Sequence, residues 1–265
     1  MSRLPICRPA ARAVCLRFAV LVLLPVAAAS AQPVSPAEVL LFETDHLAKV
    51  QAPATLVYEF RKQSNVEPAF TDSVQLDVSR KKGQLHAALQ FLSGERRQKL
   101  PEVADVHGNP VLLGFLEHDI VEMKRLTGGA VGYFRKRIRL ALANSAQVTP
   151  QRITWQGRTV EGKVVRIQPY LDDPLHARFE QYVRKIYTFV LSDSVPGGVY
   201  QVSASLANTG VNQPGTVVAR TAAAGGPASG TGTPGAAPLG TKAPGAVVPT
   251  IEETLTLVKV VASKR

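Results

Sequence analysis

Cysteine is nearly absent from the sequence. The two cysteines, Cys7 and Cys15, both lie within the first 31 residues, so the 234 residues that follow have no disulfide, no thiol nucleophile and no thiolate metal site. Cys15 also precedes the first apolar run instead of following it, which excludes it as a lipoprotein acylation site. The chain must therefore be held together by a hydrophobic core, and a domain of this length can bury enough apolar surface to form one.

Aromatic residues and catalytic motifs are also scarce. Aromatic side chains make up 6% of the chain, which argues against a stacking platform for bases or sugars. The sequence has no GxSxG nucleophile elbow, no GxGxxG motif and no P-loop. We therefore expect a protein that is not an enzyme and has no catalytic residue, no cofactor and no metal site.

The first 31 residues have the order of a secretory signal peptide. Four arginines and no acid are followed by an apolar run over residues 18–29 and by the small residues Ala29-Ser30-Ala31. The apolar run is too short to span a bilayer, because spanning takes about 20 apolar residues. The sequence therefore predicts a cleaved signal peptide over residues 1–31 and a periplasmic location.

Positive charge exceeds negative charge in the remaining chain. Loss of the four leader arginines lowers the formal net charge from +11 to +7. In an exported protein the anionic partners of such a charge are membrane headgroups or glycolipid. We expect no nucleic-acid partner.

Helix signals occur at three places. Ser35-Pro36-Ala37-Glu38 reads as a capping box with proline in the first turn, and predicts a helix of about a dozen residues that ends before Pro53. Asn109-Pro110 opens a second helix, which Gly128-Gly129 ends. Residues 133–142 also fit the alternation of a strand, but their Arg, Lys, Leu and Ala content favours a third helix.

Period-two alternation indicates an antiparallel sheet. Apolar residues alternate with polar residues in 55–62, 74–79 and 85–91, and the polar turn Arg80-Lys81-Lys82-Gly83 joins the last two runs as a hairpin. Further strands are predicted within 152–167, 185–192, 199–206 and 251–261. The predicted fold class is α+β, with a strongly curved antiparallel sheet, a half-barrel, packed on two or three helices.

One segment differs in composition from the rest. Residues 209–249 are dominated by Gly, Ala, Pro and Thr, with no aromatic and no acidic residue, so we expect them to be disordered. The predicted organisation is a curved-sheet domain over 32–208, this insertion, and a final strand within 250–265 that returns to the domain. The alternative is a C-terminal tail whose last strand pairs weakly or with another molecule.

Two clusters of polar residues could carry chemistry. Asp172, Asp173 and His176 could bind a cation or act as acid and base, but Asp before Pro174 is explained by helix capping. His118 and Glu122 are spaced to reach one metal ion, but a polar helical face explains them equally. A hydrolase or metal enzyme on the first cluster is therefore the least favoured function.

A cluster of cations lies in the third predicted helix, and two interpretations of it remain open. Four cations are more than the dipole of the helix would require, and an anionic surface would relieve the repulsion between them. A solvated face paired with Glu117, Asp119 or Glu122 explains them equally. The four residues are Arg135, Lys136, Arg137 and Arg139.

The order of these elements resembles the LolA/LolB-like superfamily of periplasmic lipoprotein carriers and related uncharacterised periplasmic families. The resemblance covers 35–206 and 251–261 and consists of a capped helix over 35–50, strands within 56–91, helices within 109–142, and then strands. It implies a half-barrel that binds acyl chains in its concave face. The long insertion and the basic helix depart from that plan.

Only two or three helices are predicted to cover the sheet. They either fill its concave face or leave a cavity there, so two functions remain open. The first is a non-enzymatic exported protein that binds a lipid-like or other hydrophobic ligand, such as an acyl chain, in a cavity over the sheet. The alternative is a structural or interaction module of the cell envelope, with a dry core and with residues 209–249 reaching a partner protein. The predicted cavity lining is Leu56, Tyr58, Phe60, Leu85, Leu89 and Phe91.

Overall fold

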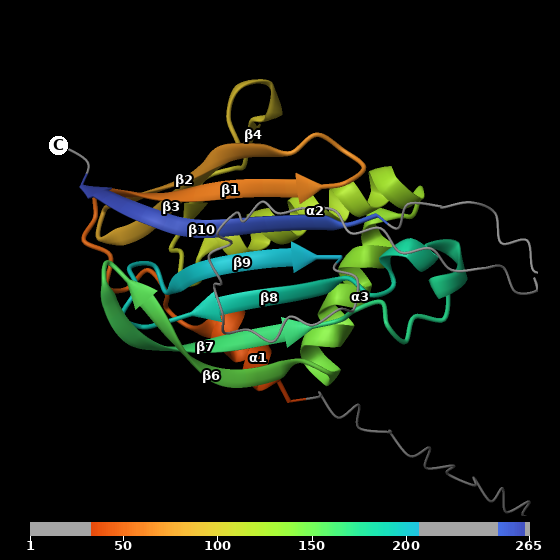
Figure 1. The fold of residues 1–265 in the computed structure, drawn as a ribbon. Helices are drawn as coiled ribbons and strands as arrows, with labels where there is room; N and C mark the ends of the chain where they lie inside the picture. The colour runs from red at the N-terminus through yellow and green to blue at the C-terminus, as the bar shows by residue number, and fades with distance from the viewer. Residues whose placement is uncertain (1–32, 207–248, 263–265) are drawn as a thin grey trace, which may run out of the picture. The chain divides into compact units, whose positions relative to one another are not determined.

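A computed structural model describes residues 33–206 and 249–262 of the protein. The predicted signal peptide and all but the last residue of the predicted insertion lie outside these residues. The described part confirms the α+β class: it contains a ten-stranded antiparallel sheet and the helices α1, α2 and α3 (Figure 1). The strands are β1 Ala54–Ser64, β2 Phe70–Lys81, β3 Gln84–Phe91, β4 Gln98–Lys99, β5 Val103–Ala104, β6 Gln147–Trp155, β7 Arg158–Ile167, β8 Ile186–Leu191, β9 Val199–Ser205 and β10 Ile251–Ala262.

The sheet is open, and the last strand lies in its interior. The strand order is β4-β3-β2-β1-β10-β9-β8-β7-β6, with β5 paired to β3 off this path. β10 pairs with β1 along its whole length and with β9 over Glu252 to Thr256. The backbone N–H of Leu206 donates to the carbonyl of Ile251 at 2.7 Å, so residues 207–248 connect two neighbouring strands. β10 is therefore an interior strand and not a weakly paired tail.

The first helix begins as predicted but is shorter. Ser35 and Glu38 form the capping box, and α1, Pro36–Glu38, continues directly as the π-helix η1, Val39–Glu43. The expected length of a dozen residues is wrong, because the backbone is extended at Thr44. The Thr44 hydroxyl donates to the carbonyl of Val39 at 3.0 Å, and Nε2 of His46 lies 2.9 Å from the carbonyl of Leu40. These side chains bind carbonyls that a longer helix would have used.

The other two helices confirm their sequence signals. In α2, Pro110–Thr127, the side chain of Asn109 accepts from the N–H of Val111, and Gly128 ends the helix at a φ of 70°. That φ lies in the left-handed region, which favours glycine. Residues 131–144 form α3, Val131–Asn144, so the strand interpretation is wrong. The buried side chains of α3 recur at helical spacing: Phe134, Ile138, Ala141 and Leu142.

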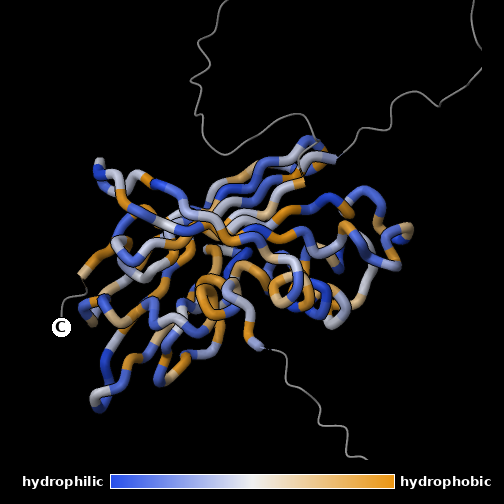
Figure 2. The backbone as a smooth tube through the Cα atoms, turned by 90° about the horizontal axis from the view of Figure 1, so that it is seen from below, coloured by the Kyte–Doolittle hydropathy of each residue, from blue (hydrophilic) through white to orange (hydrophobic). Residues whose placement is uncertain are grey.

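The helices cover the apolar face of the sheet. Figure 1 looks onto the sheet with the helices behind it, and Figure 2 shows hydrophobic positions gathered where strands and helices meet. α2 contacts β3 and β9, and α3 contacts β7. The opposite face is polar and partly or fully open to solvent, as at Glu59 and Arg61 of β1 and Thr254 and Thr256 of β10.

One glycine brings the backbone of α2 directly onto β3. A Cβ atom added at Gly114 would lie 2.5 Å from Cδ2 of Leu89 and 3.4 Å from Cδ2 of Phe91. Both neighbours are buried. An added side-chain atom would require the end of the Leu89 side chain to move, so the helix and the sheet are in van der Waals contact here.

We predict that Gly114→Ala lowers the free energy of unfolding by about 1 kcal/mol. Overpacking costs about 1–3 kcal/mol and outweighs the gain in helix propensity of about 1 kcal/mol. The matched control is Gly132→Ala in α3, where an added Cβ meets no atom within 4 Å and should be neutral or stabilising. Urea denaturation measures both variants. Equal stability of the two would show that α2 has room above β3.

Candidate functional site

Four of the six residues predicted to line a cavity, Tyr58, Phe60, Leu89 and Phe91, pack against α2 or its cap. Leu56, Tyr58, Phe60, Leu89 and Phe91 are at most 3% exposed, and Leu85 is half-buried. The ring of Phe60 lies 5.7 Å from that of Phe91 and 6.4 Å from that of Phe115 in α2. Nδ2 of Asn109, the α2 cap, donates to the Tyr58 hydroxyl at 3.0 Å. A ligand at these residues would have to displace α2.

The four cations of α3 divide into two pairs. Arg135 forms an ion pair with Glu117 of α2 at 2.7 Å, and Nε of Arg137 lies 2.8 Å from Oδ2 of the buried Asp173. Lys136 and Arg139 are exposed and form no ion pair with a described residue. Two of the cations therefore hold the structure together, and two remain free to contact an anion.

The acidic cluster of residues 172–176 anchors its own segment. The helix-capping interpretation of Asp173 is wrong, because the next helical turn, His176–Arg178, has no side-chain cap. Asp173 accepts hydrogen bonds from the Tyr133 hydroxyl and, at 2.8 Å, from the N–H of Leu175, in addition to its ion pair with Arg137. Asp173 thus fastens the 3₁₀ helices η3, His176–Arg178, and η4, Glu180–Tyr182, to α3. Its carboxylate is buried and lies beside the guanidinium of Arg137.

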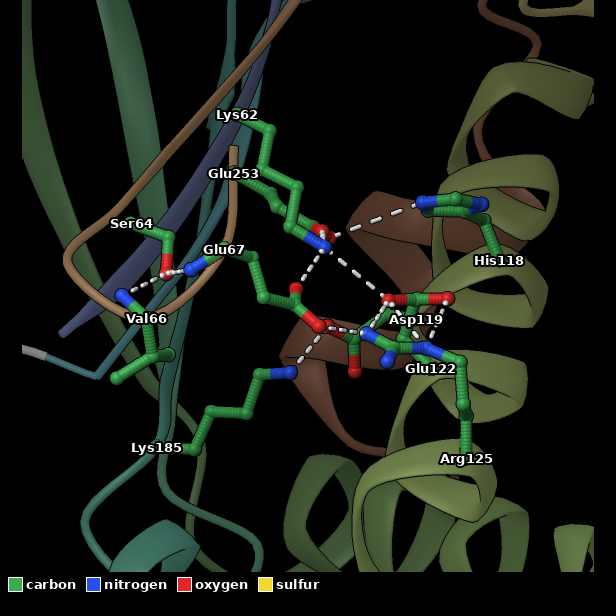
Figure 3. A network of polar contacts seen from close by, with 10 residues as sticks. All are labelled: Lys62, Ser64, Val66, Glu67, His118, Asp119, Glu122, Arg125, Lys185 and Glu253. Atoms are coloured by element: carbon green, nitrogen blue, oxygen red, sulfur yellow. Dashed lines mark hydrogen bonds and ion pairs between the residues drawn. The ribbon is translucent and has the colours of Figure 1, made fainter. Parts of the chain in front are cut away.

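A buried cluster of charges joins the sheet to α2. Lys62 of β1 and Glu253 of β10 lie opposite each other in the sheet and face α2 (Figure 3). Nζ of Lys62 lies 2.8 Å from Glu67, 3.1 Å from Glu122 and 3.3 Å from Glu253. The guanidinium of Arg125, one turn beyond Glu122, contacts Glu122 at 2.7 Å and Glu67 at 2.5 Å. These contacts attach β1, β10 and the loop between β1 and β2 to α2.

A second buried group lies next to this cluster. Asp119 of α2 forms an ion pair with Lys185, and its Oδ2 accepts from the Tyr187 hydroxyl at 2.5 Å. The hydroxyls of Tyr187 and Tyr170 are 3.1 Å apart. Because Asp119 and the two tyrosines are fully buried, the charge of Asp119 depends on Lys185 for compensation.

Burial and neighbouring charges shift the pKa values in opposite directions. Burial raises the pKa of Glu122, but Arg125 and Lys62 outweigh burial and lower it to about 2. Burial lowers the pKa of Lys62, but Glu67, Glu253 and Glu122 outweigh burial and raise it. Glu253 is different, because burial and the charge of Asp119 raise its pKa to about 7.

His118 faces Glu253 without a hydrogen bond. Its Nε2 lies 3.9 Å from Oε2 of Glu253, and within the described residues neither ring nitrogen of His118 nor this Oε2 has a hydrogen-bond partner. Burial lowers the pKa of His118, which favours the neutral ring. The cluster therefore combines a paired part around Lys62 with an unsatisfied part at His118 and Glu253.

The sequence contains a signal for this cluster. Lys62 occupies the next inward position after Leu56, Tyr58 and Phe60, and Glu253 lies between the inward residues Ile251 and Leu255. A charge on the apolar face of a strand is buried and needs a partner. The alternation within 55–62 predicts Leu56, Tyr58 and Phe60 on the inward face but assigns no inward role to Lys62 or Glu253, so it misses the cluster.

The cluster stabilises the packing of α2 on the sheet. Its side chains are largely closed to solvent, and no group of three or more His, Cys, Asp or Glu residues within 33–206 and 249–262 could hold a metal ion. In the same part of the chain no helix is long and apolar enough to cross a membrane. The whole chain matches no known family model and no curated protein.

We predict that Glu253→Gln stabilises the protein relative to the wild type increasingly as the pH rises from 5 to 8. The pKa of Glu253 is about 7 in the folded chain and 4.5 ordinarily, so the native state binds this proton more tightly. The resulting stability is complete below pH 4.5 and is lost as the pH rises through about 7. Gln stays neutral at every pH. Loss of the Lys62 contact therefore changes the free energy of unfolding by the same amount at each pH, whereas removal of the Glu253 charge adds a stabilisation that grows with pH.

The control for this experiment is Glu252→Gln, on the exposed side of the same strand. Chemical denaturation at several pH values gives the free energies. Parallel pH curves for the two variants would contradict a buried, protonatable Glu253.

Proposed function

We propose that the chain is a non-enzymatic interaction module with a dry core, which docks on an anionic membrane surface through the exposed sides of α2 and α3. The docking face consists of Leu113, Val121 and Lys124 on α2 and of Lys136, Arg139 and Leu140 on α3. The observation that carries the proposal is the combination, on two joined helices, of exposed apolar side chains with cations that have no ion-pair partner among the described residues.

The apolar residues of the docking face are open to solvent. Leu113 is 54% exposed, Val121 48% and Leu140 39%. The Arg135–Glu117 ion pair joins α2 to α3, so the exposed sides of the two helices are neighbours. Apolar side chains beside cations are typical of surfaces that lie in a membrane interface.

Charge strengthens this interpretation. Lys124, Lys136 and Arg139 are exposed and form no ion pair with a described residue. Each Lys or Arg close to an anionic bilayer contributes about 1 kcal/mol, so three cations contribute about 3 kcal/mol. That energy supports weak, reversible docking that salt would weaken.

The ligand-binding function predicted from the sequence has less support. It needs a cavity bounded by a half-barrel sheet and lined by residues such as Leu56 and Phe60, and these contact the core beneath α2. A hydrophobic ligand over the sheet therefore stays a prediction that requires α2 to move. Capture of an envelope protein by residues 209–249 lies outside the described part of the chain.

We predict that the purified protein co-sediments with vesicles containing 30% phosphatidylglycerol and not with pure phosphatidylcholine vesicles. The double variant Lys136→Gln/Arg139→Gln should bind about 30-fold more weakly, because two contacts of about 1 kcal/mol are lost. Vesicle titration at low and at physiological salt measures the partition.

The control removes two exposed cations elsewhere, by Arg97→Gln and Arg158→Gln. If both double variants bound the vesicles equally weakly, net charge alone would explain the loss of binding. That result would contradict a defined docking face. Absence of binding to the anionic vesicles would contradict membrane docking altogether.

A further inference from the structure

A cleft of about 550 Å³ lies where the turn between α2 and α3 meets the segment that holds η3. Its volume is within the range of small-molecule sites, which is about 300–1,000 Å³. None of the residues predicted from the sequence to line a cavity borders it. The lining residues are Thr127, Gly128, Gly129, Ala130, Tyr133, Phe134, Leu175, Arg178 and Phe179.

Aromatic side chains line this cleft: Tyr133 is half-buried, whereas Phe134 and Phe179 are buried at its base. The rings of Tyr133 and Phe134 lie 5.8 Å apart at 80°, and those of Phe134 and Phe179 lie 6.0 Å apart at 73°. The Tyr133 hydroxyl is occupied by Asp173, so Tyr133 presents mainly its ring. Leu175 is 40% exposed. Walls of this kind favour a flat ring, because aromatic pairs gain energy in edge-to-face and offset arrangements.

One cation lines the cleft without a partner. Arg178 is exposed and forms no ion pair with a described acid, whereas the nearby Arg137 is bound by Asp173. A guanidinium binds a carboxylate or sulfonate through two parallel hydrogen bonds. The cleft therefore offers an apolar aromatic wall and one site for an anionic group.

Two features fix the shape of the cleft: the glycines of the turn between α2 and α3, and the contacts of Asp173 with Tyr133 and Arg137. Gly128 has a φ of 70°, and a Cβ atom at Gly129 would lie 2.6 Å from the ring of Phe134. The turn can approach the ring this closely only without a side chain at residue 129. Asp173 holds the opposite side through Tyr133 and Arg137. A ligand would thus find the walls already in place.

We propose that this cleft binds a small aromatic anion, with its ring against Tyr133 and Leu175, above the buried Phe134, and its carboxylate or sulfonate on Arg178. The recognised class is an aromatic molecule of one to three rings that carries one anionic group. This site is independent of membrane docking, because it needs no bilayer and uses none of the residues of the docking face.

The test is a fluorescence titration of the full protein with 8-anilinonaphthalene-1-sulfonate in the absence of vesicles. We expect saturable binding in the micromolar range, weakened at least tenfold by Arg178→Gln and unchanged by the control Arg158→Gln. Leu175→Glu, which places an acid at an exposed position of the lining, should weaken it further. All three positions are exposed, so circular dichroism and the thermal midpoint should match the wild type.

Competition identifies the ligand class. 1-Naphthoate should displace the probe at concentrations at least tenfold lower than octanoate or neutral 1-naphthol. Equal binding by the Arg178→Gln and Arg158→Gln variants would overturn the site, and equal displacement by octanoate would overturn the preference for a ring. Failure here with intact vesicle binding would remove the cleft proposal alone.

Discussion

The contact of α2 with the sheet is the interaction on which the rest of the structure depends. At Gly114 the helix backbone reaches Leu89 and Phe91, and further along the same helix Glu122 and Arg125 meet Lys62. The first contact excludes water, and the second pairs charges that would be costly if left alone in a low-dielectric interior. α2 is thus held by packing at one position and by ion pairs at another.

This attachment decides which surfaces are exposed. The inward residues of β1 and β3 belong to the core, whereas Leu113 and Val121 of α2 and Leu140 of α3 stay exposed. α3 is fixed in the same manner, by Arg135 on Glu117 and by Arg137 on Asp173. Their neighbours Lys136 and Arg139 form no ion pair within the described part of the chain, which is why they are the cations that the proposed docking face uses.

Local features of the fold could be predicted from the sequence. The capping box at Ser35, the Asn109 cap and the hairpin between β2 and β3 each rest on neighbouring residues. The role of Phe60 and its neighbours could not be predicted, because residues that fill a core and residues that line a cavity share one pattern. Lys62 and Glu253 could have been noticed, since both interrupt an apolar face. Their partners on α2 depend on tertiary packing, which local pattern does not determine.

Native-state hydrogen exchange of the α2 amides tests the central claim most directly. If α2 is fastened to the sheet, amides from Phe115 to Met123 exchange only with global unfolding, with the free energy and denaturant dependence of β1 and β10. Exchange of these amides at a clearly lower free energy, while β1 and β10 stay protected, would show that α2 opens as a lid and would contradict the account.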